Sequence, residues 1–304
     1  MADSVVSIAG SITALATPFT PAGEVDFAAW SRLIEAQISA GTEALVVAGS
    51  TGEAAMLTDH EYDALLKQAV ATVAGRLPVL AGTGLSATAK TIELTQRAKA
   101  LGADAALVVT PPYVRPTQAG LIAHYQAVAD HGGLPVMLYN VPGRTGCDML
   151  PETVAALAGH PAIIGIKEAV AAPERVEALL KLKSAGFVVL SGDDPTACRA
   201  MLAGADGVIS VASNVLPAAF RRLSDAARGA DADAASALDA ALQPLCDFIG
   251  CEPNPIPIKA LLRRFEIGDG LRLPLTPLTD ANASRLEPVA AAILAIEHQC
   301  RNAA

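Results

Sequence analysis

The chain has 304 residues, of which 52% are hydrophobic and 17% charged, and its formal net charge is -9. The hydrophobic content suffices for a large core, but no apolar run reaches the roughly 18 uninterrupted residues of a membrane span. The acidic balance, without clusters of Lys and Arg, disfavours nucleic acid as a partner. These features predict a soluble protein that binds neither a membrane nor nucleic acid.

The N-terminus and the cysteines indicate the compartment. Residues 1–7 contain no basic segment of the kind that opens a secretory leader. The five cysteines are scattered, odd in number and without a Cys-x-x-Cys pair, which favours reduced thiols over a disulfide framework or a zinc site. We therefore expect a cytoplasmic protein.

Short apolar runs rich in β-branched residues recur along the first two-thirds of the chain. They predict strands at 11–16, 44–48, 78–82, 105–109, 135–139, 162–166, 187–190 and 207–211. The gaps between them hold stretches rich in Ala and Leu with helical periodicity, clearest at 27–40, 59–73 and 88–100. The chain thus alternates strands with helices.

The pattern of each predicted strand indicates the kind of sheet. None alternates apolar with polar residues as a half-solvated strand would, so both faces should be buried, as in a parallel sheet covered by helices. Eight such repeats predict a closed (β/α)8 TIM barrel over residues 1–216. Residues 217–304 lack strand patterns and predict a C-terminal helical region that packs on the barrel within the same structural unit.

Lys167 closes the apolar run 162–166, where the strand should be buried on both faces. Active sites of such barrels lie at the carboxyl ends of the strands, so a Lys there is a functional candidate. Desolvation favours a neutral amine, which can form a Schiff base with a keto substrate. The alternative is a Lys whose ammonium extends to solvent from the strand end.

Other strand ends carry polar groups that fit this chemistry. Tyr139 ends its strand and can relay protons near an amine, although a buried phenol can also be structural. Arg144 presents a planar fork suited to a carboxylate, or is a solvated loop residue. The Gly49–Gly52 turn, with Ser50 and Thr51, offers hydroxyls and successive N–H groups to a small anion, or is an ordinary tight loop.

Two adjacent carboxylates, Asp193 and Asp194, follow the seventh predicted strand and resemble a metal site. Pro195 and Thr196 come next, which is typical of a helix start, and no His accompanies the pair. We therefore favour a helix cap over a metal site and expect no bound metal.

Several segments together resemble the Schiff-base aldolase superfamily that includes dihydrodipicolinate synthases and N-acetylneuraminate lyases. The resemblance spans nearly the whole chain, and the 254–259 and 271–277 segments resemble the synthase branch more than the lyase branch. The most specific segments are Gly-Ser-Thr-Gly-Glu at 49–53, Tyr-Asn-Val-Pro-Gly-Arg-Thr-Gly-Cys-Asp-Met at 139–149, Gly-Ile-Lys-Glu-Ala at 165–169, Leu-Ser-Gly-Asp-Asp at 190–194 and Asn-Pro-Ile-Pro-Ile-Lys at 254–259.

The resemblance implies a lyase of lysine and diaminopimelate biosynthesis that condenses pyruvate with L-aspartate 4-semialdehyde to give 4-hydroxy-tetrahydrodipicolinate. It implies that Lys167 forms the Schiff base with pyruvate and that Tyr139 relays the protons. Ser50 and Tyr113 would extend this relay, with Tyr113 reaching in from a neighbouring subunit.

The same resemblance implies the groups that hold the substrates. Thr51 and the backbone of Ile209 would bind the keto acid end of pyruvate, and Arg144 the carboxylate of the aldehyde. No metal, nucleotide or other cofactor is implied. A Tyr supplied by a neighbour requires at least a dimer, and the resemblance implies a homotetramer built from dimers.

The chain departs from the family pattern at two places. Ser50 stands where synthases usually carry Thr, and Pro112 and Val114 replace a second Tyr and an Asn. Lysine-inhibited synthases usually carry His, Glu and Tyr at the positions of Asp59, Lys90 and Pro112. Because a Lys at position 90 repels the ammonium groups of a bound lysine, we expect little or no feedback inhibition.

Two other functions compete with the synthase. A pyruvate-dependent sugar-acid or sialic-acid lyase, or a keto-acid dehydratase, would use the same Schiff base on another partner. A barrel that binds a keto acid without catalysis would need neither Lys167 nor Tyr139 as reactive groups.

Overall fold

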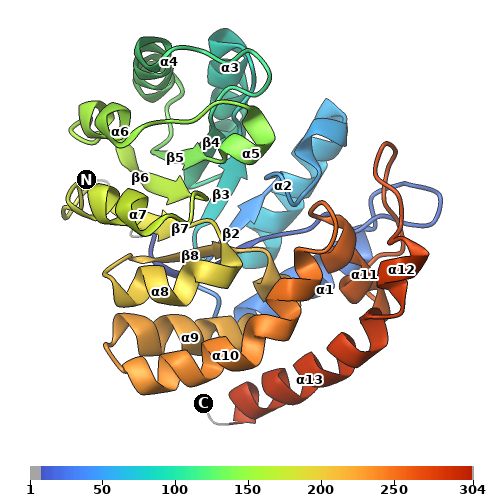
Figure 1. Ribbon diagram of the computed structural model, residues 1–304. Helices are drawn as coiled ribbons and strands as arrows, with labels where there is room; N and C mark the ends of the chain where they lie inside the picture. Colours follow the sequence, from blue (N-terminus) through green and yellow to red (C-terminus); the bar gives the residue numbers. More distant parts are fainter. Residues whose placement is uncertain (1–7, 303–304) are drawn as a thin grey trace.

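The computed structural model describes residues 8–302 of the chain. Residues 1–7, on which the prediction of no secretory leader rests, lie outside the described residues. Eight parallel strands form a closed barrel in sequence order, because β1 pairs with both β2 and β8 (Figure 1). The predicted (β/α)8 barrel is therefore confirmed. The strands are β1 (Gly10–Ala14), β2 (Ala44–Val47), β3 (Val79–Gly82), β4 (Ala105–Val109), β5 (Val136–Asn140), β6 (Ile163–Glu168), β7 (Val188–Ser191) and β8 (Gly207–Ser210).

Helices follow the strands and surround the barrel (Figure 1). Helix α2 (Asp59–Val73) begins with a capping box in which Thr58 and Glu61 each satisfy a backbone N–H of the other. The remaining helices of this ring are α1 (Phe27–Ser39), α3 (Thr88–Ala100), α4 (Gln118–His131), α5 (Pro142–Thr145), α6 (Pro151–Leu157), α7 (Pro173–Leu180) and α8 (Ala197–Leu202). The bounds predicted for the second and third helical segments, 59–73 and 88–100, agree with α2 and α3.

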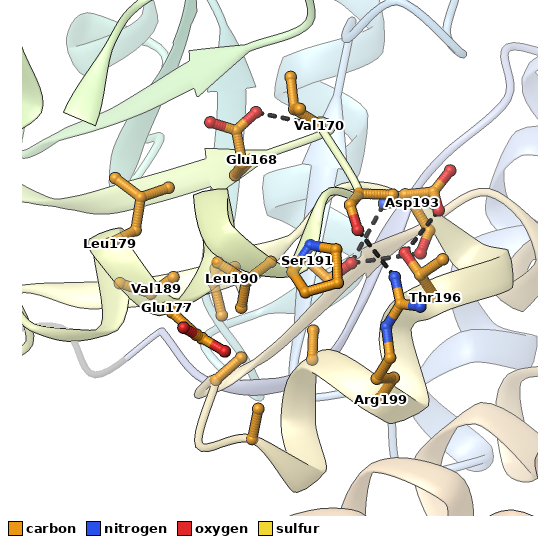
Figure 2. Close-up of a pocket in the computed structure, with 16 residues that line it drawn as sticks. Glu168, Val170, Glu177, Leu179, Val189, Leu190, Ser191, Asp193, Thr196 and Arg199 are labelled. Carbon is orange, nitrogen blue, oxygen red and sulfur yellow. Dashed lines mark hydrogen bonds between the residues drawn. The ribbon is translucent and has the colours of Figure 1, made fainter.

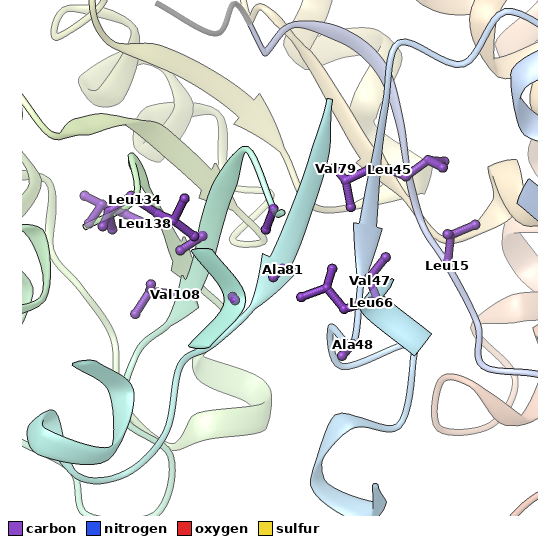
Figure 3. Close-up of a cluster of buried hydrophobic side chains, with 14 of the residues drawn as sticks. Leu15, Leu45, Val47, Ala48, Leu66, Val79, Ala81, Val108, Leu134 and Leu138 are labelled. Atoms are coloured by element: carbon purple, nitrogen blue, oxygen red, sulfur yellow. The ribbon is translucent and has the colours of Figure 1, made fainter. Parts of the chain in front are cut away.

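Both faces of the strands are buried, as their unbroken apolar patterns predict. In β2, Leu45 and Val47 join the cluster between the sheet and the helices (Figure 3), whereas Ala44 and Val46 belong to the cluster inside the barrel. This alternation follows from the two-residue period of a strand. It also determines which strand residues can line a site at the carboxyl ends of the strands, since only side chains that face the barrel interior open onto that end.

The C-terminal helices extend the helical layer on one side of the barrel. Helix α9 (Pro217–Arg228) contacts β1 and β8, so it covers the strands where the barrel closes. Helices α10 (Ala232–Ile249), α11 (Ile256–Arg264), α12 (Asp280–Ala283) and α13 (Leu286–Asn302) follow, and α13 packs on α9, α10 and α11. The division of the chain at residue 216 stays a prediction, and the helix that completes the ring lies on its C-terminal side.

Buried apolar side chains hold this helical region together, among them Phe220, Leu245, Phe248 and Ile293. Among residues 8–302, no helix is both long enough and apolar enough to cross a membrane.

Candidate active site

Lys167 and Tyr139 lie side by side at the carboxyl end of the barrel. Strands β5 and β6 pair in a register that places Tyr139 directly opposite Lys167. The Lys167 Nζ atom is 4.4 Å from the centroid of the Tyr139 ring, and both residues are buried. Lys167 lies within β6, whose ladder extends to Glu168, so the strand runs two residues past its predicted end. Because Lys167 is buried, its amine does not extend to bulk solvent.

A cavity of about 290 Å³ opens beside these two residues. Its walls combine the loops after the strands with residues of the C-terminal helical region. An adjoining cavity of about 400 Å³ shares Ser50, Tyr139, Arg144 and Asn254 with it. The first cavity is lined by Ala14, Val46, Gly49, Ser50, Thr51, Leu107, Tyr139, Val141, Arg144, Lys167, Ala169, Gly192, Asp193, Asp194, Pro195, Val211, Cys246, Ile249, Gly250 and Asn254.

The turn after β2 brings two hydroxyls to the cavity, as the sequence predicts. Ser50 is half-buried, whereas Thr51 is buried and its Oγ1 atom accepts a hydrogen bond of 3.0 Å from Asn254 Nδ2. The N–H groups of Gly52 and Glu53 donate to carbonyls within the turn. Of the N–H groups expected to face an anion, that of Gly52 is therefore already used within the tight turn.

Arg144 lies in the short helix α5, at the mouth shared by the two cavities. It is exposed, and its Nη2 atom donates a hydrogen bond of 2.9 Å to the backbone oxygen of Asn254. Asn254 thus contacts both Thr51 and Arg144. The segment 254–259 carries part of the family resemblance, but no local pattern shows that Asn254 reaches the loops after β2 and β5, so the sequence predicts no role for it.

Asp194, which lines the cavity, joins the loop after β7 to the loop after β8. One carboxylate oxygen accepts hydrogen bonds from the N–H groups of Val211, at 2.9 Å, and Ala212, at 3.0 Å. Burial raises the pKa of this carboxyl, and the hydrogen bonds from the β8 loop and the Lys167 ammonium oppose that rise. The predicted helix start at Asp193 and Asp194 is confirmed, since a short 3-10 helix (Asp194–Thr196) begins there with Asp193 at its N-cap position and Pro195 in its first turn. No side chain caps this helix, and the Asp194 carboxylate instead accepts from the turn after β8.

Two predicted site residues do not line either cavity. Ile209 is buried inside the barrel, on β8, and Val211, two residues further along the chain, lines the cavity. Tyr113 is 92% exposed, and its backbone is held in the left-handed region, with φ of 73°. Its backbone N–H donates a hydrogen bond of 3.1 Å to the carbonyl of Thr145. Within one chain, therefore, the structure brings together Lys167 and Tyr139 with the hydroxyl and guanidinium groups but leaves this phenol outside.

A different cavity, of about 250 Å³, lies between β6 and β7 on one side and α7 and α8 on the other (Figure 2). Its walls are mostly apolar, and neither Lys167 nor Tyr139 lines it. Arg199, on its rim, already donates a hydrogen bond of 2.7 Å to the carbonyl of Ala171. Lys167 and Tyr139 thus belong to the cavity at the barrel rim.

Comparison with known proteins agrees with this geometry. The model of the dihydrodipicolinate synthetase family matches residues 7–293. A 4-hydroxy-tetrahydrodipicolinate synthase from Xanthomonas axonopodis pv. citri is 66% identical over 96% of this chain and 97% of its own length, and one from Stenotrophomonas maltophilia is 63% identical over 96% and 98%.

Solved structures extend the likeness. The chloride-inhibited dihydrodipicolinate synthase of Acinetobacter baumannii, complexed with pyruvate, has a TM-score of 0.92 and 43% identity, covering 94% of this chain and 99% of that one. A structure described as the first monomeric dihydrodipicolinate synthase variant has a TM-score of 0.92 and 37% identity, covering 94% and 97%. The predicted family is confirmed: the chain belongs to the dihydrodipicolinate synthetase family.

Proposed function

We propose that this chain condenses pyruvate with L-aspartate 4-semialdehyde to give 4-hydroxy-tetrahydrodipicolinate, in lysine and diaminopimelate biosynthesis. The observation that carries the proposal is the buried Lys167 Nζ atom, 4.4 Å from the ring centroid of Tyr139, on a cavity that Arg144 also lines. An amine next to a phenol supports imine chemistry, because a nucleophile and a proton donor are both required.

The reaction begins when the neutral Lys167 amine attacks the keto carbon of pyruvate. Tyr139 passes a proton to the carbinolamine oxygen, which leaves as water, and an imine remains. Loss of a methyl proton converts the imine to an enamine. The enamine carbon then attacks the aldehyde carbon, forming the new C–C bond, and the aldehyde oxygen takes up a proton. Finally the amine of the aldehyde substrate attacks the imine carbon, closes the ring and releases Lys167.

The remaining site residues bind and orient the substrates in this proposal. Thr51 and the backbone of Ile209 hold the keto acid end of pyruvate, and Ser50 continues the proton relay from Tyr139. Arg144 binds the carboxylate of the aldehyde through its planar donor fork. Its position at the mouth of the cavity supports that role, because the second substrate enters after the imine has formed.

Intact-protein mass after pyruvate and borohydride, followed by turnover with aspartate semialdehyde, tests the proposal. We expect a reduced pyruvyl adduct that Lys167→Ala abolishes and Lys183→Ala retains. Lys183 is a matched control, because it lies outside the cavity and pairs with Asp206 at 2.9 Å. An adduct without turnover would favour the lyase or dehydratase alternative. No adduct at all would leave the non-catalytic keto-acid binder.

Tyr113 belongs to the relay of a neighbouring subunit in the same proposal, within a homotetramer built from dimers in the cytoplasm. Its near-complete exposure supports this placement, since a phenol that serves its own site would not face solvent. Coexpression of Lys167→Ala with Tyr113→Phe tests it. Mixed dimers hold one intact site if Tyr113 acts across the interface, so activity should return. Permanently inactive mixtures, or an active monomer in sedimentation, would contradict the placement.

A further inference from the structure

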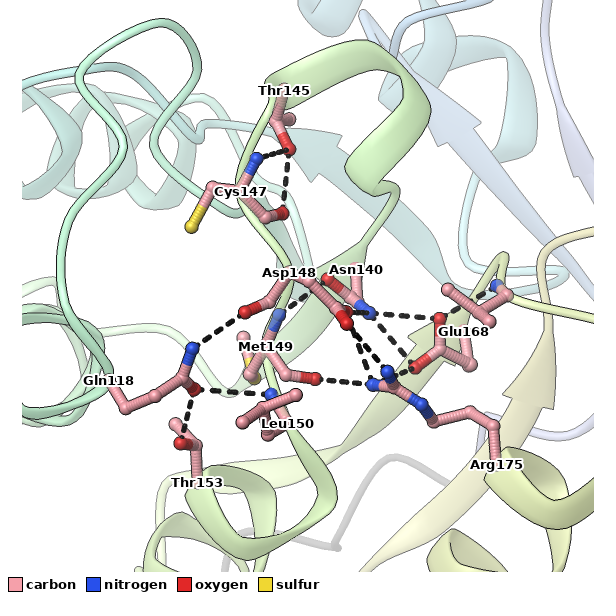
Figure 4. Close-up of polar contacts among 11 residues, drawn as sticks. Gln118, Asn140, Thr145, Cys147, Asp148, Met149, Leu150, Thr153, Glu168 and Arg175 are labelled. Carbon is pink, nitrogen blue, oxygen red and sulfur yellow. Dashed lines mark hydrogen bonds and ion pairs between the residues drawn. The ribbon is translucent and has the colours of Figure 1, made fainter. Parts of the chain in front are cut away.

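The residues that directly follow Tyr139 and Lys167 form a pair of their own. Asn140 and Glu168 are opposite one another in the same register, one step beyond the site pair. Because strand residues alternate between faces, they lie on the outer side of the barrel wall (Figure 4). Both are buried, and neither lines the cavity that holds Lys167.

The side-chain amide of Asn140 is fully used. Its Nδ2 group donates to Asp148 Oδ1 at 2.8 Å and to the two carboxylate oxygens of Glu168 at 3.0 and 3.1 Å. Its Oδ1 atom accepts from the N–H of Met149 at 2.9 Å. One buried amide thus joins the end of β5 to the end of β6 and to the far end of the loop 141–149.

Arg175, from α7, closes this arrangement (Figure 4). Its guanidinium lies 2.6 Å from Asp148 Oδ2, 3.7 Å from Glu168 Oε2, and donates to the carbonyl of Met149 at 2.7 Å. The N–H of Val170 also donates a hydrogen bond of 2.8 Å to Glu168 Oε1. We call Asn140, Asp148, Glu168 and Arg175 the Asn140 network. Its carboxylates have hydrogen-bond partners in a buried place, where an unpaired group would be costly.

The three segments that the network joins, two strand ends and one loop, carry three of the proposed site residues. Tyr139 ends β5, Lys167 lies near the end of β6, and Arg144 lies in the loop that Met149 closes. A shift of any of these segments would change the distance between the amine and the phenol, or the place of the guanidinium. None of the four network residues lines the cavity that holds Lys167, Tyr139 and Arg144.

We infer that Asn140 is a positioning residue of this enzyme, whose amide sets the relative placement of the Lys167 amine, the Tyr139 phenol and the Arg144 loop. This inference rests on the proposed function. It differs from a role in stability alone, because it predicts a loss in imine formation and in aldehyde binding that exceeds the loss expected from destabilisation.

Asn140→Ala tests the inference, with Glu297→Ala as the matched control. Glu297 is also buried, and its carboxylate accepts from the N–H groups of Ala218 and Ala219, neither of which lines the cavity. Each variant removes a buried polar contact. The assays are the thermal unfolding midpoint, the rate at which borohydride traps the pyruvyl adduct, and kcat and KM for the aldehyde.

At a temperature where both variants stay folded, Asn140→Ala should trap pyruvate about 10- to 100-fold more slowly than wild type, because small displacements of reacting groups cost this much. Its KM for the aldehyde should rise as the Arg144 loop loosens. Glu297→Ala should keep its trapping rate within about twofold, as expected of a distant, independent site. Glu168→Gln keeps an acceptor for Asn140 but loses the charge opposite Arg175, and should fall between wild type and Asn140→Ala.

Wild-type trapping rates in both Asn140→Ala and Glu168→Gln would overturn the inference. A slowdown of Asn140→Ala no greater than that of Glu297→Ala at equal loss of stability would reduce Asn140 to a structural residue and overturn it as well. If Asn140→Ala does not fold, Glu168→Gln decides alone, with a wild-type rate refuting the inference. Failure of the proposed function shows separately, because wild type itself would then give no adduct or no turnover.

Discussion

Removing the buried ammonium of Lys259 should destabilise the fold strongly. Lys259, from α11, forms an ion pair with Glu53 of the turn after β2, and their side chains are 7% and 0% exposed. The Lys259 Nζ atom also lies 4.1 Å from the centroid of the Phe19 ring. Burial lowers the pKa of this ammonium to about 8, and the Glu53 carboxylate opposes that shift. In Lys259→Met the carboxylate would stay buried without its partner.

The expected loss is about 3–5 kcal/mol in the free energy of unfolding, which is typical when one partner of a buried pair is removed. Lys90→Met is the matched control, because Lys90 pairs with Glu93 at 2.9 Å on the surface, with side chains 67% and 62% exposed. Exposed pairs contribute little, since water and salt screen them, so the control should leave the free energy of unfolding nearly unchanged.

Urea unfolding followed by circular dichroism measures both variants, with the slope checked for a two-state transition. Adding Glu53→Gln to Lys259→Met should recover about 2 kcal/mol or more, because the uncompensated charge is then gone. A Lys259→Met protein within about 1 kcal/mol of wild type would refute the reasoning. It would mean that Glu53 finds water or another donor once Lys259 is removed.

Three further predictions concern pH and regulation. Hydrogen bonds from Arg272 lower the pKa of Glu61 to about 2, so the unfolded chain binds the extra proton. Stability should fall as pH drops from 4.5 to about 2, with a smaller slope for Glu61→Gln in acid unfolding. Burial raises the pKa of Glu168 to about 7, so the folded chain binds the extra proton. Stability should decline as pH rises from 4.5 to about 7, and Glu168→Gln should flatten that decline. Added lysine should leave the rate of condensation unchanged in a coupled assay, because the positive charge of Lys90 repels the ammonium groups of a lysine bound beside it. Inhibition at micromolar lysine would contradict this prediction.

The sequence alone determined the barrel and singled out Lys167 and Tyr139 as its candidate site pair. The apolar runs of the strands and the helical periodicity between them are patterns local to each segment, so the sequence shows them directly. Lys167 was identifiable because a charged residue ended an apolar run, and Tyr139 because it ended the run before it. The rule that barrel sites lie at the carboxyl ends of strands then placed both on one rim.

Only the tertiary structure decided how that rim is built. Asn254 reaches Thr51 across 203 residues of sequence and Arg144 across 110, and no local pattern encodes either contact. The placement of Asn140 against Glu168 likewise needs the register of β5 on β6. Hydrogen-bond partners of this kind are specified by closure of the barrel and by packing of the C-terminal helices. They become definite only when distant segments share one buried, low-dielectric environment in which every polar group needs a partner.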